Sequence, residues 1–345
     1  VLIQSICENI IPKLVSSDIP LFQSLLSDVF PGAPPYVITE KQLRAQVENI
    51  AKARHLVPTA EWQEKLLQLY QVQVIRHGVM LVGPSGSGKT AAWSVLLEAL
   101  EQITGVKSKA YVLDPKAITK DQLFGHLDQT TREWTDGLFT ATLRKIIDNL
   151  RGESEKRHWI IFDGDVDPEW VENLNALLDD NKILTLPNGE RLALPDHVRI
   201  VFEVQDLKYA TLATVSRCGM IWFNEDTVSN QMIFENYLST LSAIPLDETE
   251  RLTMTPDAPT PAGLIKQRDC AAILRPYFAP NQVVERCLVD AEPRWHIMEF
   301  TRLRVLTSAF SLLNKSILNV LEYMAKHNTN YDGMLLEKYM VNRLL

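Results

Sequence analysis

Short apolar runs alternate with segments of helical period through the middle of the chain. The intervening segments repeat apolar residues every three to four positions, which is typical of amphipathic helices. Alternating strands and helices predict an α/β layer fold in which helices flank a parallel sheet. The apolar runs, typical of buried parallel strands, are VMLVG (79–83), KAYVLDP (109–115), HWIIFDG (158–164) and VRIVFEVQD (198–206).

One segment between the third and fourth runs has a different pattern. ILTLPNGERLALP (183–195) places two short apolar stretches around Asn188-Gly189. An Asn-Gly pair is the strongest short-range signal for a tight hairpin turn. The sequence therefore predicts a β-hairpin insert in the α/β region.

The two ends of the chain show only helical period. We expect a helical segment over 1–55, an α/β domain over 56–230 and a small helical domain over 231–345. Proline and threonine are frequent in residues 245–264, which predicts a loop there. The chain begins with Val1 rather than methionine, which suggests a piece of a longer protein.

Composition narrows the class of protein. The 345 residues are 46% hydrophobic and 23% charged, typical of a soluble globular protein of about two domains. The net charge of −8 argues against nucleic acid as a partner. No apolar run approaches the roughly 18 residues of a membrane span, so we expect no membrane contact. Four cysteines show no zinc-binding spacing and are expected to be reduced thiols of a cytosolic protein: Cys7, Cys218, Cys270 and Cys287.

One motif predicts a phosphate-binding loop. GPSGSGKT follows an apolar run, opens a helical segment and fits the pattern G-x-x-x-x-G-K-[ST]. Its glycines let backbone N–H groups turn inward, and the following helix points its positive end at the phosphates. Lys89 is expected to contact the β- and γ-phosphates and the Thr90 hydroxyl to ligate Mg²⁺. The expected cofactors are ATP and Mg²⁺, bound by Gly83, Pro84, Ser85, Gly86, Ser87, Gly88, Lys89 and Thr90.

A second site residue ends the third apolar run. Asp163 closes WIIFD, where P-loop nucleoside triphosphatases place the Asp that holds Mg²⁺, here through water. Hydrolysis also needs a group that activates the attacking water, usually a carboxylate, but the next residue is Gly164. The acidic residues that follow either reach this water or form a solvated turn and a helix N-terminus. They are Asp165, Asp167 and Glu169.

Longer stretches resemble a known family. The phosphate loop, WIIFDG, the hairpin and the helical C-terminal region resemble an AAA+ module, which implies a large P-loop domain and a small helical lid. Three stretches resemble the second AAA+ module of cytoplasmic dynein heavy chains: DPKAITKDQLFGHLDQTTREWTDGLF, IIFDGDVDPEWVENLNALLDDNKILTLPNGERL and FEVQDLKYATLATVSRCGM. The resemblance covers nearly the whole chain except 245–264. It implies that residues 1–55 include the end of the preceding module's lid.

The resemblance also implies roles for individual residues. A polar residue at the end of the fourth strand would sense the γ-phosphate, and we assign this to Gln205 ahead of Glu203. Arg217, in TVSRCGM, matches the arginine finger that acts on the preceding module's nucleotide. Arg304, with Arg302 as second choice, would contact this module's own phosphates from the lid, or else form a surface salt bridge.

Dynein heavy chains are microtubule motors with six such modules in one ring, so the resemblance implies a cytoplasmic, cytoskeletal ring segment. Because Gly164 has no side chain, we expect a module that binds ATP, hydrolyses it weakly or not at all, and relays ring motion. Its direct partners would be the neighbouring modules. Microtubules and the dynein intermediate, light-intermediate and light chains would be reached only through the whole minus-end-directed motor. The backbone of residues 74–78 would contact adenine.

Three alternatives stay open at this point. An actively hydrolysing ATPase module would use Asp165 or Glu169 in place of the missing carboxylate. An AAA+ chaperone or DNA-remodelling subunit would usually assemble rings of identical chains. A small-molecule P-loop kinase would need an arginine-lined acceptor site, and the sequence shows no such cluster.

Overall fold

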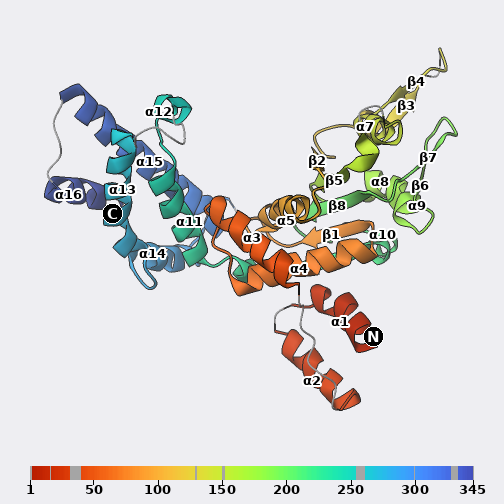
Figure 1. Ribbon diagram of the computed structural model, residues 1–345, viewed down its shortest axis with the longest axis horizontal. Coiled ribbons are helices and arrows are strands. Elements are labelled where there is room, and N and C mark those ends of the chain that lie inside the picture. The colour runs from red at the N-terminus through yellow and green to blue at the C-terminus, as the bar shows by residue number, and fades with distance from the viewer. Residues whose placement is uncertain are drawn as a thin grey trace. The chain divides into compact units, whose positions relative to one another are not determined.

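The described part of the chain forms two compact units (Figure 1). The first comprises residues 1–50 and 58–227, and the second comprises residues 51–57 and 228–345. No helix in the described part is long and apolar enough to cross a membrane. The computed structural model describes residues 2–15, 17–31, 40–128, 130–149, 152–253, 261–298, 300–327 and 333–344, so part of the predicted 245–264 loop lies outside it.

A five-stranded parallel sheet forms the centre of the first unit. The strand order is β2-β5-β8-β1-β9, and each neighbouring pair runs parallel, so the predicted parallel sheet is confirmed. Sequence reasoning found four of the strands and missed β9, which pairs with β1 at the edge of the sheet. The carboxyl ends of all five strands meet at one edge, where open α/β sheets bind ligands. The strands are β1 (Gly78–Val82), β2 (Ser108–Leu113), β5 (Arg157–Asp163), β8 (Val198–Val204) and β9 (Gly219–Trp222).

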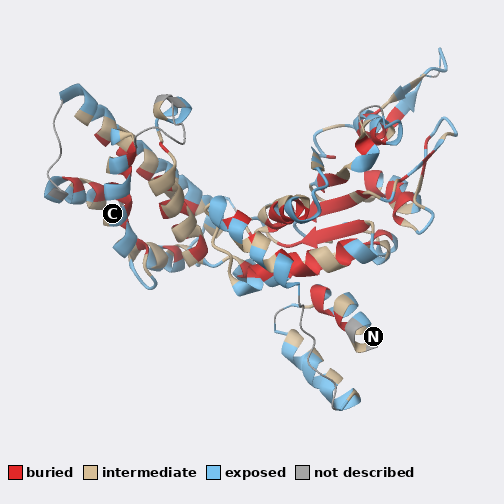
Figure 2. Ribbon diagram, viewed as in Figure 1, coloured by how far each residue is buried: buried red, intermediate tan, exposed pale blue. Residues whose placement is uncertain are grey.

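Helices cover both faces of this sheet, and its central strands are buried (Figure 2). On one face lie α4 (Ala60–Ile75) and α5 (Lys89–Thr104), which pack against each other. On the other face Phe162 stacks on Phe202 with ring centroids 5.4 Å apart, and Trp170 covers both. The short helices of that face are α6 (Lys120–Phe124), α7 (Leu138–Ile147), α8 (Pro168–Val171) and α9 (Asn175–Leu178).

The segment 168–180, one of the intervening segments whose helical period predicts a helix, forms three short pieces. The 3₁₀ turn η3 (Glu172–Leu174) separates α8 from α9. The buried side chains of this segment nevertheless follow helical spacing, so the apolar period correctly identified which residues enter the core. They are Trp170, Val171, Leu174, Leu177 and Leu178.

Two hairpins extend from the sheet domain (Figure 1). The predicted hairpin is confirmed as β6 (Ile183–Thr185) and β7 (Arg191–Ala193), and Gly189 in its turn has φ +86°. The second joins β3 (Gly125–Leu127) to β4 (Trp134–Asp136). Arg144 of α7 connects the two, since its guanidinium contacts Asp136 at 2.8 Å and Glu190 at 2.8 Å. The hairpins are therefore held to the same helix.

The first 50 residues also belong to the first unit. The helix α1 (Leu2–Ile10) packs on α4, and the 3₁₀ turn η1 (Ile11–Lys13) packs on β9. Cys7 and Ile11 are buried there. Next come α2 (Ile19–Val29) and α3 (Lys41–Ala53). The assignment of 1–55 to a preceding module's lid stays a prediction.

The second unit is helical and has its own core. Tyr237 stacks on Phe310 with centroids 4.0 Å apart and donates to Asn314 Oδ1. Gln267 is fully buried, and its side-chain amide satisfies backbone groups at the end of α11. His55 joins residues 51–57 to this unit, because its carbonyl accepts from Asn236. The helices are α11 (Asn230–Ala243), α12 (Glu248–Thr253), α13 (Ala262–Leu274), α14 (Val283–Ala291), α15 (Arg302–His327) and α16 (Gly333–Leu344).

Candidate nucleotide site

The phosphate loop connects the carboxyl end of β1 to α5. Gly86 and Gly88 have φ of +85° and +87°, a left-handed backbone that glycine adopts without steric cost. A Cβ at Gly83 would overlap the carbonyl oxygen of Phe223, so the start of the loop also requires glycine. The Gly83 N–H donates to Val204 O at 3.1 Å, which ties the loop to β8. The first N–H groups of α5 have no partner within the helix, so loop and helix end fit a phosphate group.

Lys89, the first residue of α5, folds back over the loop. It is 7% exposed, and its Nζ donates to the carbonyl oxygens of Gly83 (2.6 Å) and Pro84 (2.8 Å). A third contact, to Ser87 Oγ, is longer at 3.5 Å. An ammonium has three donors. One N–H can therefore go to a phosphate oxygen while two stay on the loop.

Asp163 ends β5 in register with Glu203 of β8 and is exposed. The next residue, Gly164, has φ +145°, and its N–H donates to Glu203 O at 3.1 Å. A Cβ at Gly164 would meet no atom closer than 3.7 Å. Space alone would permit a side chain, but this backbone conformation is unfavourable for any residue except glycine. The position after Asp163 is therefore built without a carboxylate.

The acidic residues after Gly164 are partly engaged in local structure. Asp165 Oδ2 accepts from Lys116 Nζ at 2.7 Å in an exposed ion pair. Asp167 caps α8, because its Oδ1 accepts from the Glu169 N–H at 3.0 Å. Glu169 is exposed in the first turn of that helix, where a negative charge complements the helix dipole.

Sequence reasoning named Glu203 only as the second candidate for the γ-phosphate sensor and missed its contact with Thr90. The Thr90 hydroxyl donates to Glu203 Oε1, and Trp93 Nε1 donates to Glu203 Oε2 at 2.9 Å. Glu203 is 9% exposed. Burial lowers the pKa of Lys89, and the carboxylates of Glu203 and Asp163 oppose that effect. The available signal was one acidic residue inside the otherwise apolar strand VRIVFEV.

These residues fit a magnesium nucleotide. Mg²⁺ prefers oxygen ligands and is usually bound by one or two carboxylates together with substrate phosphates. A hydroxyl from Thr90 and a carboxylate from Asp163 flank the loop that would hold those phosphates. The bound nucleotide would supply the reactive phosphate, and the Mg²⁺ ion would neutralise the charge of the phosphates.

Two further phosphate contacts were expected from the resemblance, at Gln205 and at Arg304 or Arg302. Gln205 directly follows β8 and is exposed. Arg304 is exposed in the first turn of α15 and belongs to the second unit, as does Arg302. Both roles stay predictions.

Arg217 lies in the last turn of α10 (Leu212–Arg217), the helix between β8 and β9. Its Nε donates to Asp179 Oδ1 at 2.5 Å, and Nη1 donates to Ala213 O at 2.7 Å. The ion pair is partly exposed, with about a third of each side chain accessible to solvent. The guanidinium therefore has a fixed orientation at the surface of the first unit.

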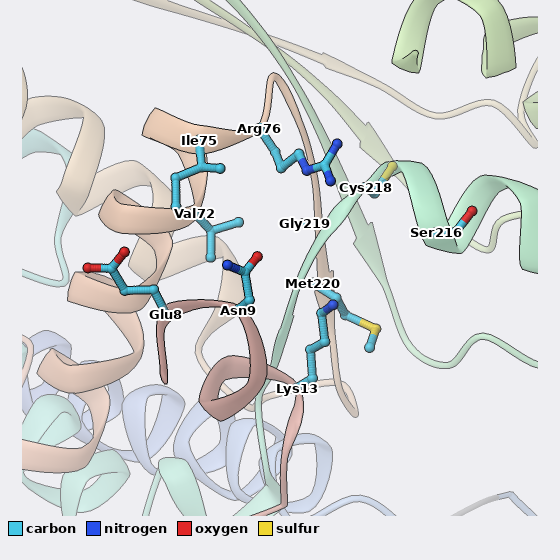
Figure 3. A pocket seen from close by; sticks show the side chains of 10 residues that line it. All are labelled: Glu8, Asn9, Lys13, Val72, Ile75, Arg76, Ser216, Cys218, Gly219 and Met220. Atoms are coloured by element: carbon cyan, nitrogen blue, oxygen red, sulfur yellow. The ribbon is translucent and has the colours of Figure 1, made fainter. Parts of the chain in front are cut away.

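A small cavity lies behind this helix end (Figure 3). Arg76 reaches across it toward Cys218, and Asn9 and Lys13 come from the N-terminal segment. Its volume of about 40 Å³ admits a few water molecules but no nucleotide. The cavity is therefore not a second nucleotide site.

The expected adenine contact of residues 74–78 stays a prediction. These residues enter β1 at its amino end, whereas the phosphate loop leaves its carboxyl end, roughly 16 Å away for five residues. The start of α4 lies beside the loop, because Trp62 Nε1 donates to Gly88 O at 3.4 Å. Nothing in the sequence pattern marked Trp62 as a neighbour of the loop.

Two family models match the chain. Residues 1–90 match the model described as the hydrolytic ATP binding site of the dynein motor region. Residues 78–218 match the AAA domain of the dynein-related subfamily. The second match contains the phosphate loop, Asp163 and Arg217.

Curated relatives match nearly the full chain. A cytoplasmic dynein heavy chain from Dictyostelium discoideum is 58% identical over 381 residues, covering 100% of this chain and 8% of the relative. One from Drosophila melanogaster is 56% identical over 340 residues, covering 95% of this chain and 7% of the relative. The chain thus spans less than a tenth of the length of these relatives. The parallel sheet, the phosphate loop and these matches identify the chain as an AAA region of the dynein heavy-chain family.

Proposed function

We propose that this chain is the second AAA+ module of a cytoplasmic dynein heavy chain and holds Mg-ATP with weak or no hydrolysis. The retained groups are those that bind: the loop, Lys89, Thr90 and Asp163. The group that cleaves is missing. The module would then close and stiffen its ring and pass on rigid-body motion, with a hinge between its large domain and its lid.

One observation carries this proposal. Gly164 follows Asp163 in a glycine-type backbone conformation, so no carboxylate extends from the position where one would activate the attacking water. Binding and cleavage are separable here because phosphate contacts lower the energy of the bound nucleotide whether or not a base is present.

The hydrolysing alternative would use Asp165 or Glu169. The ion pair of Asp165 with Lys116 favours a structural role for that residue. The exposed Glu169 carries no observation that selects it as a base. We therefore rank this alternative second.

For Arg217 we propose the role of an arginine finger toward the preceding module. Its fixed guanidinium at the end of α10 supports this role, since Asp179 holds it in one orientation. An arginine finger stabilises charge in the transition state and can accelerate phosphoryl transfer by roughly 10³- to 10⁵-fold. The benefit would appear at the neighbouring site.

Other activities belong to the whole motor on this proposal. Minus-end-directed movement on microtubules, and contact with intermediate, light-intermediate and light chains, would need the complete heavy chain. Cytoplasmic localisation follows the same reasoning, since the relatives are named cytoplasmic dynein heavy chains. A chaperone-type ring of identical chains is disfavoured by the matches that run along the chain.

The test is the state of the nucleotide at this site. The intact heavy chain is incubated with Mg-ATP for hours and imaged at a resolution that shows individual phosphates. We expect an intact γ-phosphate between Lys89, Thr90 and Asp163. ADP would count against the proposal if a single-turnover assay then showed cleavage rather than exchange. In that case Asp165 and Glu169 would be the first residues to replace.

A further inference from the structure

Glu203, the second candidate for the γ-phosphate sensor, lies beside the residues proposed to bind Mg²⁺. In β8 it is in register with Leu81 of β1 on one side and Asp163 of β5 on the other. Its neighbours Phe202 and Val204 belong to the core on the opposite face. The Glu203 side chain therefore lies on the face covered by α5, where it contacts Thr90 and Trp93.

The hydrogen bonds of Glu203 fix the direction of the Thr90 hydroxyl. That hydroxyl has one proton and two lone pairs. Because the proton goes to Glu203 Oε1, the lone pairs are left for other partners. A hydroxyl that ligates Mg²⁺ must offer a lone pair to the ion, so its proton has to point elsewhere.

Trp93 fixes the carboxylate in turn. Its indole N–H donates to Oε2 at 2.9 Å, while Oε1 accepts from Thr90. Thr90 and Trp93 are three residues apart on α5 and so lie on one side of the helix. One buried carboxylate thus spans two donors of the helix that begins at the phosphate loop.

We infer that Glu203 is a positioning residue of the magnesium site: it holds the Thr90 hydroxyl with a lone pair toward the ion and adds a negative charge beside it. This deepens the proposed function and rests on it, since it concerns how the bound nucleotide is retained. Partners that orient a metal ligand typically contribute about 10- to 100-fold to metal affinity. The consequence is slow loss of nucleotide when Mg²⁺ is present.

The same contacts argue against Glu203 as the catalytic base. Both of its oxygens already accept hydrogen bonds, from Thr90 and Trp93. It is also 9% exposed and faces α5. A base for hydrolysis would have to reach a water in line with the γ-phosphate.

Nucleotide retention in the intact heavy chain tests the inference. Each variant is loaded with labelled ATP, passed through gel filtration, and followed as it loses label in buffer with Mg²⁺ or with EDTA. A Lys89→Ala chain measures the label held at other sites, and its subtraction isolates this site. Chromatography of the retained label distinguishes ATP from ADP.

Glu203→Gln keeps the size of the side chain and removes its charge. We divide the half-time of nucleotide retention in Mg²⁺ by the half-time in EDTA. We expect this ratio to fall by about tenfold or more, while the half-time in EDTA stays unchanged. Trp93→Phe should lower the ratio less, because Thr90 keeps its acceptor. Glu172→Gln changes the same charge at an exposed residue of η3 and should match the unmodified chain.

Two outcomes would overturn the inference. Equal ratios for Glu203→Gln and the unmodified chain would show that Glu203 only joins β8 to α5. Equal shortening in Mg²⁺ and in EDTA would show a packing effect without a role toward the ion. If the unmodified chain retains ADP made by cleavage, the proposed function fails. The ratio of retention half-times in Mg²⁺ and in EDTA still decides the role of Glu203 in that case.

Discussion

Replacement of Lys89 tests the phosphate site most directly. Lys89 is the buried cation of the loop, and two of its three donors already contact Gly83 O and Pro84 O. Among the residues that the structure describes, the third donor has only the 3.5 Å contact to Ser87 Oγ. Lys89→Ala removes the ammonium, and Lys89→Met removes it while keeping most of the apolar stem.

The size of the effect follows from one lost contact. A hydrogen bond to a charged group contributes about 1.5–3 kcal/mol. Since about 1.4 kcal/mol changes Kd tenfold, nucleotide binding should weaken roughly 10- to 140-fold. Both variants should lose affinity by similar factors, because the charge rather than the stem makes the contact.

The assay is the occupancy of this site in the intact heavy chain, imaged over a range of ATP concentrations. Lys107→Ala removes an exposed positive charge beyond the end of the same helix and serves as the control. Half-occupancy should shift to higher ATP concentration for both Lys89 variants and stay unchanged for the control. An unshifted curve for Lys89→Met would refute the role of the ammonium.

Three further outcomes test the remaining assignments. Arg217→Ala should slow ATP turnover at the preceding site by roughly 10³-fold or more in a single-turnover assay; a normal rate would show that Arg217 only pairs with Asp179. Asp165→Asn combined with Glu169→Gln should leave cleavage at this site unchanged, whereas a loss would favour the hydrolysing alternative. Burial lowers the pKa of His158. Below about pH 6.5 the unfolded chain therefore binds a proton at His158 before the folded chain does. The free energy of unfolding then falls as the pH falls, by at most roughly 1.4 kcal/mol per pH unit. His158→Gln should flatten that slope in denaturant titrations at pH 5.5 and 7.5, and an unchanged slope would contradict this.

The sequence predicted best where local chemistry determines local structure. The glycines of GPSGSGKT and the Asn188-Gly189 turn require special backbone geometry, so their residue types identify the loop and the hairpin. Buried strands of five to seven residues were visible as continuous apolar runs. β9 was missed because it has only four residues, and its pairing with β1, more than 130 positions away in the chain, cannot be read from a local pattern.

Side-chain partners were predicted less well because they depend on contacts between distant segments. Thr90 and Glu203 are 113 positions apart, and their contact requires the register of β8 beside β1 as well as the rotation of α5. The same holds for Arg217 and Asp179, whose ion pair joins α10 to the end of α9.

The distribution of carboxylates explains why this site would retain a nucleotide without cleaving it. An acid after Asp163 would face the attacking water, and that position is Gly164. The additional acid is Glu203 on the neighbouring strand, where it contacts the Thr90 hydroxyl that we propose ligates magnesium. A hydrolytic site would have a carboxylate beside the attacking water. On our proposal, this site has its additional carboxylate beside the metal ion instead. Charge at the ion stabilises the bound nucleotide before any reaction, and such ground-state binding does not lower the barrier to cleavage.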